Sequence, residues 1–318
     1  MEEFALLNRR GFIKRSLLLG AASVVGTLPA FATAKGDFRL TILHTNDVHS
    51  RIEPFPLDGS RYAGMGGVAR RSALIQKIRG EEKSVLLVDS GDMFQGTPYF
   101  NMFGGKLELE LMSKLGYEAG TFGNHEFDNG IAGLVKYLGK ATFPFLTANY
   151  DFRGTLLEGK TKDYTIINKN GIRIGLTGVG IDIEGLVDPK SYEGMKYLDP
   201  IPVVNRIAKM LKEDKKCDLV ICLSHLGYKY DDDKISDLKL AAQIRHVDII
   251  LGGHTHTFLD EPARVEDLDG HEVVIHQVGF AGIRLGRLDV ILNKNTGKKQ
   301  ILARNYTVDQ RYDKQVMA

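Results

Sequence analysis

Hydrophobic residues along the chain form short apolar runs that alternate with amphipathic helical patterns. The apolar runs predict strands at 38–44, 85–89, 119–122, 145–148, 163–168, 172–179, 218–224, 248–251, 272–278, 284–293 and 300–306. The helical patterns predict helices at 67–80, 107–115, 130–138, 203–212 and 235–245. Between 203 and 212 the apolar side chains recur at the spacing of one buried helix face, which indicates a helix packed on a sheet.

Two turn signals indicate where strands pair in an antiparallel manner. Asn170-Gly171 separates two predicted strands, and this dipeptide accepts the positive φ angles of a type I′ hairpin turn. A second hairpin is predicted around 295–297. Because parallel βαβ units dominate the first half, we expect an α/β fold of two mixed sheets with helices outside, a four-layer α/β/β/α sandwich.

The first 34 residues have the pattern of an export signal. Arg9-Arg10, with Phe12 and Lys14, precedes an apolar run at 16–28 and a small-x-small cleavage pattern at 32–34. The run is shorter than the roughly 20 residues of a membrane-spanning helix. The paired arginines resemble a twin-arginine (Tat) signal; a Sec signal or a basic amphipathic N-terminus is the alternative. We expect an exported, periplasmic or extracytoplasmic protein without a membrane span after signal removal, and one domain over 35–318.

Composition narrows the function classes. The chain has 318 residues, 43% hydrophobic and 26% charged, as folded globular proteins have. Beyond residue 34, 38 basic and 38 acidic side chains balance, which argues against a nucleic acid polymer or an anionic membrane as partner.

Cys217 and Cys222 are about 16 Å apart in a predicted strand, and a disulfide spans at most about 7 Å. We therefore expect two free thiols and no Cys-based zinc site.

Five polar clusters follow predicted strands directly: Asp47-Val48-His49, Gly91-Asp92, Gly123-Asn124-His125-Glu126 with Asp128, Ser224-His225 and Gly252-Gly253-His254-Thr255-His256. Residues just beyond the carboxyl ends of strands line the binding crevice of open α/β sheets. The glycines allow sharp turns where a Cβ would collide or φ must be positive. Imidazole, carboxylate and amide ligands without thiolate suit Zn, Mn, Fe or Co better than Ca or Mg. Seven ligands are too many for one ion and fit two ions that share a bridge.

In order and type, these clusters resemble the signature blocks of calcineurin-like metallophosphoesterases. The segments 43–49 and 124–128 narrow the resemblance to the catalytic domain of 5′-nucleotidases, and the match covers 38–306. The resemblance implies the metallophosphatase fold and two divalent metal ions. It implies that metal one is held by Asp47, His49, Asp92 and His256, and metal two by Asp92, Asn124, His225 and His254.

The same resemblance implies a mechanism in which a hydroxide that bridges the metals attacks phosphorus in line. His125 would stabilise charge on the phosphoryl oxygens or protonate the leaving alkoxide, and Asp128 would orient its ring. Asn124 would also touch the substrate phosphate. We therefore expect an enzyme that hydrolyses small phosphate monoesters, 5′-nucleotides or related nucleotides among them.

Two departures from the family pattern leave alternatives open. His256 stands where many 5′-nucleotidases have Gln or Asn, whereas the wider superfamily and the related thiosulfohydrolases have His. Full-length family members continue into a C-terminal domain that holds the nucleobase, and this sequence stops at Ala318. The alternatives are the catalytic half of a two-chain nucleotidase that docks a separate specificity domain, or a hydrolase of thiosulfate-type esters or cyclic phosphodiesters.

Several other polar residues have simpler interpretations. We expect hydrogen-bonded structural roles for four histidines: His44, His246, His271 and His276. Glu126 either faces a helix or supports a ligand histidine. Arg70 and Arg71 are expected to be surface charges. The acidic run 231–233 is expected to be a solvated loop, and the glycines at 64–67 a strand-to-helix turn.

Overall fold

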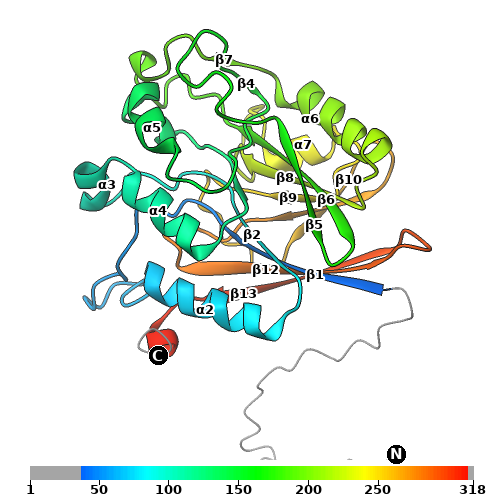
Figure 1. Cartoon of the computed structure of the whole chain (residues 1–318), viewed down its shortest axis with the longest axis horizontal. Coiled ribbons are helices and arrows are strands. Elements are labelled where there is room, and N and C mark those ends of the chain that lie inside the picture. The colour runs from blue at the N-terminus through cyan, green and yellow to red at the C-terminus, as the bar shows by residue number, and fades with distance from the viewer. Residues whose placement is uncertain (1–36, 314–318) are drawn as a thin grey trace, which may run out of the picture. The chain divides into compact units, whose positions relative to one another are not determined.

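The apolar residues of the central strands alternate between two cores, which dictates a layered architecture. The computed structural model describes residues 37–313 (Figure 1). In β1 (Asp37–Thr45), Ile42 faces one core and its neighbour Leu43 faces another. In β2 (Val85–Asp89), Leu86 and Leu87 alternate in the same way. Because successive strand side chains point to opposite faces, the sheet is buried on both sides.

Two mixed sheets form the centre of the molecule, as predicted. The first has the order β13-β12-β1-β2-β3, and β1 pairs in parallel with β2 and antiparallel with β12. Its other strands are β3 (Ala119–Gly120), β12 (Arg284–Asn293) and β13 (Lys299–Thr307). The second has the order β10-β11-β9-β8-β6-β5, in which the four inner strands are parallel and both edge strands antiparallel. Its strands are β5 (Tyr164–Lys169), β6 (Ile172–Gly180), β8 (Leu219–His225), β9 (Ile249–Leu251), β10 (Ala263–Glu266) and β11 (Glu272–His276).

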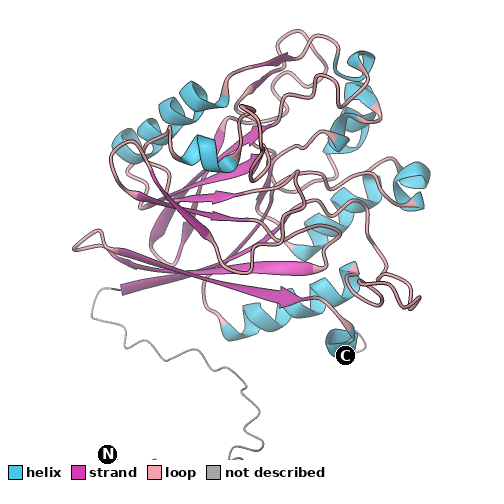
Figure 2. Cartoon of the chain, turned by 180° about the vertical axis from the view of Figure 1, so that it is seen from behind, coloured by secondary structure: helices cyan, strands magenta, loops and turns pink. Residues whose placement is uncertain are grey.

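Helices cover the outer face of each sheet, which gives the predicted α/β/β/α sandwich (Figures 1 and 2). Helices α2 (Val68–Glu81), α4 (Lys106–Leu115) and α5 (Gly130–Leu138) share a core with the five-stranded sheet. Helices α6 (Pro200–Lys209) and α7 (Asp237–Ala241) share a core with the six-stranded sheet. A third core lies between the sheets. Shorter elements are α3 (Pro98–Phe103), the pair β4 (Tyr150–Asp151) and β7 (Lys196–Tyr197), and the single helical turns His125–Phe127, Pro189–Tyr192 and Gln310–Tyr312.

Several element predictions need correction. Residues 145–148, predicted as a strand, form only isolated bridges to Gly120 and Lys162. The predicted helix at 235–245 is confined to α7, and the one at 203–212 begins at Pro200 and ends in a π-helical turn, Met210–Asp214. Strand β10 was not predicted, because its four residues are too few to reveal alternation.

The predictions of the Asn-Gly hairpin and of two free thiols are confirmed. Asn170 and Gly171 have φ angles of 46° and 81°, as a type I′ turn requires, and they join the antiparallel pair β5 and β6. Cys217 and Cys222 are buried free thiols. Across residues 37–313, no helix combines the length and apolar character needed to cross a membrane.

The parallel strands of both sheets end at the same side of the molecule, and this arrangement positions the site. In the first sheet Thr45, at the end of β1, is in register with Asp89, at the end of β2. Beyond these ends the loops bond to each other, since the amide of Asp47 donates to the carbonyl of Gly91 at 2.9 Å. The Ser90 hydroxyl donates to the carbonyl of Leu251 in the second sheet at 2.8 Å, and thereby joins the two sheets.

Candidate metal centre

The structure brings all seven predicted ligand residues together at the carboxyl ends of the strands. Their positions are Asp47 and His49 after β1, Asp92 after β2, Asn124 after β3, His225 at the end of β8, and His254 and His256 after β9. Segments more than 200 residues apart in sequence therefore meet at one place: the His254 amide donates to both Asp47 carboxylate oxygens at 3.0 Å.

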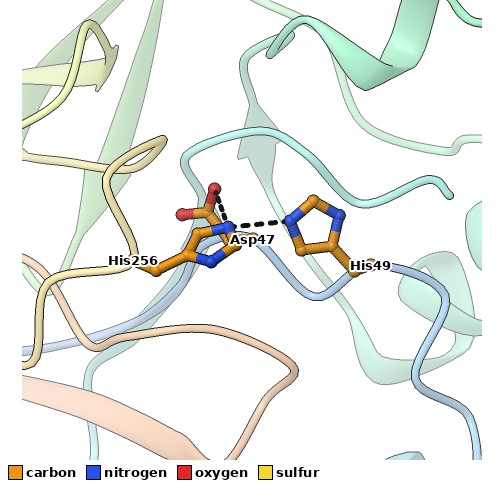
Figure 3. A group of neighbouring side chains, drawn as sticks. All are labelled: Asp47, His49 and His256. Atoms are coloured by element: carbon orange, nitrogen blue, oxygen red, sulfur yellow. Dashed lines mark hydrogen bonds and ion pairs between the residues drawn. The ribbon is translucent and has the colours of Figure 1, made fainter. Parts of the chain in front are cut away.

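A first cluster contains Asp47, His49 and His256 (Figure 3). The Nε2 atoms of His49 and His256 lie 2.9 Å apart, and His256 Nε2 lies 3.4 Å from Asp47 Oδ1. Figure 3 shows both rings and the carboxylate directed toward one another. Asp92 Oδ2 lies 4.0 Å from His49 Nε2, so the carboxylate of residue 92 borders this cluster.

A second cluster contains Asp92, His225 and His254. His225 Nε2 lies 3.1 Å from Asp92 Oδ2, and His254 Nδ1 lies 2.9 Å from Asn124 Oδ1. Asp92 is therefore within 4.0 Å of a histidine from each cluster. This is the place that a bridging carboxylate between two cations would occupy.

The chemistry of these groups fits divalent cations. His225 Nδ1 lies 2.7 Å from the Ser90 carbonyl oxygen, so this nitrogen carries a hydrogen and Nε2 faces the Asp92 carboxylate. His225 Nε2 is buried, and the polar group beside it is the Asp92 carboxylate, 3.1 Å away. The Asp47 and Asp92 side chains are almost fully buried, and such burial is unfavourable unless positive charge compensates it. The role of each residue as a ligand remains a prediction.

Burial also keeps part of this set in the form that binds metals. Desolvation, together with the charge of His225, lowers the pKa of His254 to about 4. The ring is therefore neutral at neutral pH, and only a neutral imidazole offers a lone pair to a cation.

The backbone of these loops is strained at the predicted ligands themselves. Positive φ angles occur at Asp47 (50°), His49 (50°), Asp92 (54°), His254 (73°) and His256 (52°). Non-glycine residues rarely adopt this left-handed conformation, and such outliers cluster at functional sites. The loops thus hold their side chains in orientations that relaxed turns would not give.

The glycines of the clusters serve the two purposes expected of them. Gly91 has a φ angle of 88°, which favours glycine. Gly123 is required for space, because a Cβ there would collide with the Asp92 carboxylate and the His225 ring. Gly123 therefore allows the third loop to approach the centre closely.

His125 and Asp128 form a hydrogen-bonded pair at the edge of the site. Their Nδ1 and Oδ2 atoms are 2.7 Å apart, and both side chains are partly exposed. The His125 ring lies 5.2 Å from the His49 ring, and its amide donates to Asp92 at 2.9 Å. Burial opposes charge on this ring, but the hydrogen bond to Asp128 and the charge of Asp92 outweigh it and raise the pKa of His125 to about 9. This geometry suits a proton donor, the role predicted for His125.

Glu126 supports the loops of the site by accepting hydrogen bonds from their backbone amides. Its Oε2 accepts from the amides of Asp92 at 2.9 Å and Gly123 at 2.6 Å. Its Oε1 accepts from the amides of Met93 at 2.9 Å and Phe94 at 3.2 Å. One buried carboxylate thus ties the loop after β2 to the loop after β3.

Two further positioning residues were not singled out from the sequence. Asn46 donates to the Asp47 carboxylate and to the Gly279 carbonyl, both at 2.6 Å. Gln277 donates to the Gly253 carbonyl at 2.6 Å and accepts from the Thr255 hydroxyl at 3.1 Å, which orders the His-Thr-His loop. The sequence feature that could have revealed Gln277 is its position directly after the apolar strand β11.

Outside the site, the expected structural role is met for two of the four histidines, while the side chain of His271 is largely exposed, and the expectation for Arg71 is wrong. His44 and His276 are buried and hydrogen-bonded to each other at 2.8 Å, as expected of structural histidines. Arg71 is not a surface charge: only 3% of its surface is exposed. Arg70 is also largely covered and binds Asp313. Both arginines lie on α2, where Arg71 lines a cavity with Glu108 of α4 and Arg70 binds the Gly64 carbonyl and Asp313, contacts that local sequence does not reveal.

Comparison with known proteins agrees with this geometry. Residues 40–258 match the family model of the calcineurin-like phosphoesterases. The chain belongs to the calcineurin-like phosphoesterase family. It is therefore a hydrolase that acts on phosphoester bonds, and membership in this metallophosphoesterase family implies divalent metal ions.

The similar proteins include 5′-nucleotidases. The chain is 36% identical to snake venom 5′-nucleotidase of Gloydius brevicauda over 92% of its length and 53% of the relative's. It is 36% identical to human 5′-nucleotidase over 81% of its length and 47% of the relative's. The structure of a 5′-nucleotidase precursor from Thermus thermophilus superposes with a TM-score of 0.77 at 32% identity, over 86% of this chain and 55% of that one. The chain thus spans about half of the length of the curated relatives it matches.

Proposed function

We propose that this phosphoesterase uses two divalent metal ions to hydrolyse small phosphate monoesters, with 5′-nucleotides as its main substrates. The observation that carries the proposal is the pair of ligand clusters that meet at Asp92. The similarity to proteins named 5′-nucleotidases supports a nucleotide as the substrate.

Each predicted ligand has a place in this proposal. Metal one would be held by Asp47, His49, Asp92 and His256, and metal two by Asp92, Asn124, His225 and His254. Bound there, the cations would supply positive charge that neutralises the phosphate and lowers the barrier to attack by water. Mn, Zn, Fe and Co all suit these ligands.

The protein's own groups would bind the phosphate and move the proton. His125, at the rim of the clusters, would donate hydrogen bonds to the phosphoryl oxygens and then protonate the leaving alkoxide. Asp128 would hold Nδ1 of this ring, so that Nε2 faces the substrate. Asn124, placed between His254 and the His125 turn, would contact the phosphate as well as metal two.

A substrate panel tests the proposal. Purified protein with Mn²⁺ should hydrolyse AMP and p-nitrophenyl phosphate faster than bis(p-nitrophenyl) phosphate, cyclic AMP or a thiosulfate ester. Preference for one of the last three would favour the corresponding alternative, and no hydrolysis of any would contradict the proposal. The variant His125→Ala should lose about 10²- to 10⁴-fold in kcat, whereas His271→Ala, at an exposed position, should match the parent.

We also propose that residues 1–34, which lie outside the described residues, direct export through the twin-arginine route. Support comes from the sequence alone: Arg9-Arg10, the apolar run at 16–28 and the cleavage pattern at 32–34. A reporter fused behind residues 1–34 should reach the periplasm of a Tat-competent bacterium. Replacement of both arginines by lysine should stop this transport; unchanged transport would favour a Sec signal.

Docking of a separately encoded nucleobase-binding domain remains a second proposal about partners. Its support is that large apolar side chains are exposed on segments that follow the metal loops, Leu57 with 87% and Met102 with 73% of the surface accessible. Gel filtration and AMP hydrolysis of the isolated protein provide the test. A monomer with full nucleotidase activity would exclude the need for such a partner.

A further inference from the structure

A small cavity lies directly beneath the metal loops, between α2 and α4. Its volume is about 20 Å³, and its walls include Val48 and Ser50 from the loop after β1. Arg71 of α2 and Glu108 of α4 line it from the helical layer, and Asp89 lines it at the end of β2. The cavity therefore touches two of the loops that carry predicted ligands, but it holds none of those ligands.

The polar groups that line this cavity are buried and unsatisfied. Arg71 is 3% exposed, Glu108 is 4% exposed and Ser50 is fully covered. Within residues 37–313, five of their atoms have no hydrogen-bond partner: Arg71 Nε, Arg71 Nη1, Glu108 Oε1, Glu108 Oε2 and Ser50 Oγ. A buried guanidinium with two unpaired nitrogens and a buried carboxylate with two unpaired oxygens are strongly unfavourable, which favours a group that bridges them.

Charge and size select the bridging group. An anion would meet the carboxylates of Glu108 and Asp89, and a cation would meet the guanidinium of Arg71. A cavity of this volume holds one water, since a water needs roughly 10–15 Å³ of such space and two to four polar partners. Water can accept from Arg71 and Ser50 and donate to Glu108, which gives each of the three side chains a hydrogen-bond partner.

We propose that an ordered internal water occupies this cavity and bridges Arg71, Glu108 and Ser50. Ser50 already ties its loop to neighbouring segments, since its amide donates to the Met93 carbonyl at 2.9 Å and its carbonyl accepts from the Thr97 hydroxyl at 2.7 Å. The water adds a third tie, through the hydroxyl. It thereby connects both outer helices to the residue that follows His49.

A crystal structure of the full chain tests the proposal directly. One density peak should lie about 2.6–3.2 Å from Ser50 Oγ, from a Glu108 carboxylate oxygen and from an Arg71 nitrogen. Two results would overturn the proposal: a direct Arg71–Glu108 ion pair that closes the cavity, or a cavity without density. Neither outcome depends on catalytic activity, so the test is independent of the proposed function.

A double-mutant cycle gives a second readout. Arg71→Met and Glu108→Leu should each lower the melting temperature by more than about 6 °C, because each leaves the opposite charge buried without its bridge. The double variant should melt higher than either single variant. Glu110→Gln, on the same helix but in an exposed pair with Lys140, should shift melting by no more than about 2 °C. Single variants that melt like Glu110→Gln, or a double variant that sums both losses, would overturn the bridge.

Discussion

Replacing Glu126 by Gln should loosen the centre of the site without removing any predicted ligand. The Glu126 carboxylate accepts four backbone hydrogen bonds, two on each oxygen, at 2.6–3.2 Å. A glutamine amide has one oxygen and one NH₂ group. One pair of backbone N–H groups, either Asp92 with Gly123 or Met93 with Phe94, would therefore face another donor.

The magnitude follows from the number of bonds lost. Burial raises the pKa of Glu126 to about 8, so this carboxyl group is not fully ionised at neutral pH. A hydrogen bond contributes about 0.5–1.5 kcal/mol when its acceptor is neutral and about 1.5–3 kcal/mol when it is charged, so two of them amount to about 1–6 kcal/mol. Urea unfolding of metal-free protein should show this loss in the free energy of unfolding, with the slope against urea unchanged. Because the Asp92 backbone is released, Mn²⁺ affinity should also fall by about 10- to 100-fold, as for other residues that support metal ligands.

Glu110→Gln is the matched control, since Glu110 lies in an exposed pair with Lys140. Its free energy of unfolding should stay within about 0.5 kcal/mol of the parent. The reasoning would be refuted if Glu126→Gln were as stable as this control and bound Mn²⁺ as tightly as the parent. The loop after β2 would then be held by contacts other than the Glu126 carboxylate.

Three other predictions concern acid stability, loop order and metal removal. Burial lowers the pKa of His276 to about 4, so its neutral form stabilises the fold fully above pH 6.5 and loses on the order of 3 kcal/mol as the pH falls toward 4. Urea unfolding at pH 7 and pH 5 should show a smaller drop for His276→Gln than for the exposed control His271→Gln; equal drops would contradict this. Gln277→Ala frees the His-Thr-His loop and should weaken Mn²⁺ binding by about 10-fold or more in a titration; unchanged affinity would show that the loop is ordered without it. Chelation by EDTA should abolish hydrolysis and lower the melting temperature. If calorimetry showed the same melting temperature with and without EDTA, the folded protein would not be binding metal ions.

Local pattern was sufficient for most of the fold. The strands β2 and β12 begin and end at the predicted residues, because buried strands give continuous or alternating apolar runs. The Asn170-Gly171 turn was equally readable, since its φ angles are a property of those two residues. Residues 145–148 were wrongly predicted to be a strand. An apolar run indicates that the residues are buried, but it does not indicate whether a neighbouring strand is available to pair with them.

The polar clusters of the site were also visible in the sequence, because each ligand type follows an apolar run directly. Through the family resemblance that they carry, their chemical character and their order along the chain indicate metal-dependent phosphoester hydrolysis. What local sequence did not contain was the partner of each side chain. Glu126 is a clear case, since three of its four donors are more than 30 residues away in sequence.

The amino-acid sequence by itself determined the layered α/β class, the order of the elements and the set of side chains predicted to bind metal. Each of these depends on residues close together along the chain. Tertiary structure alone decided that Arg71 and Glu108 face one buried cavity, that Glu126 holds four amides, and that Asp92 lies between two clusters. Those facts depend on how two sheets and their helices pack, and packing joins residues whose separation in sequence carries no signal of contact.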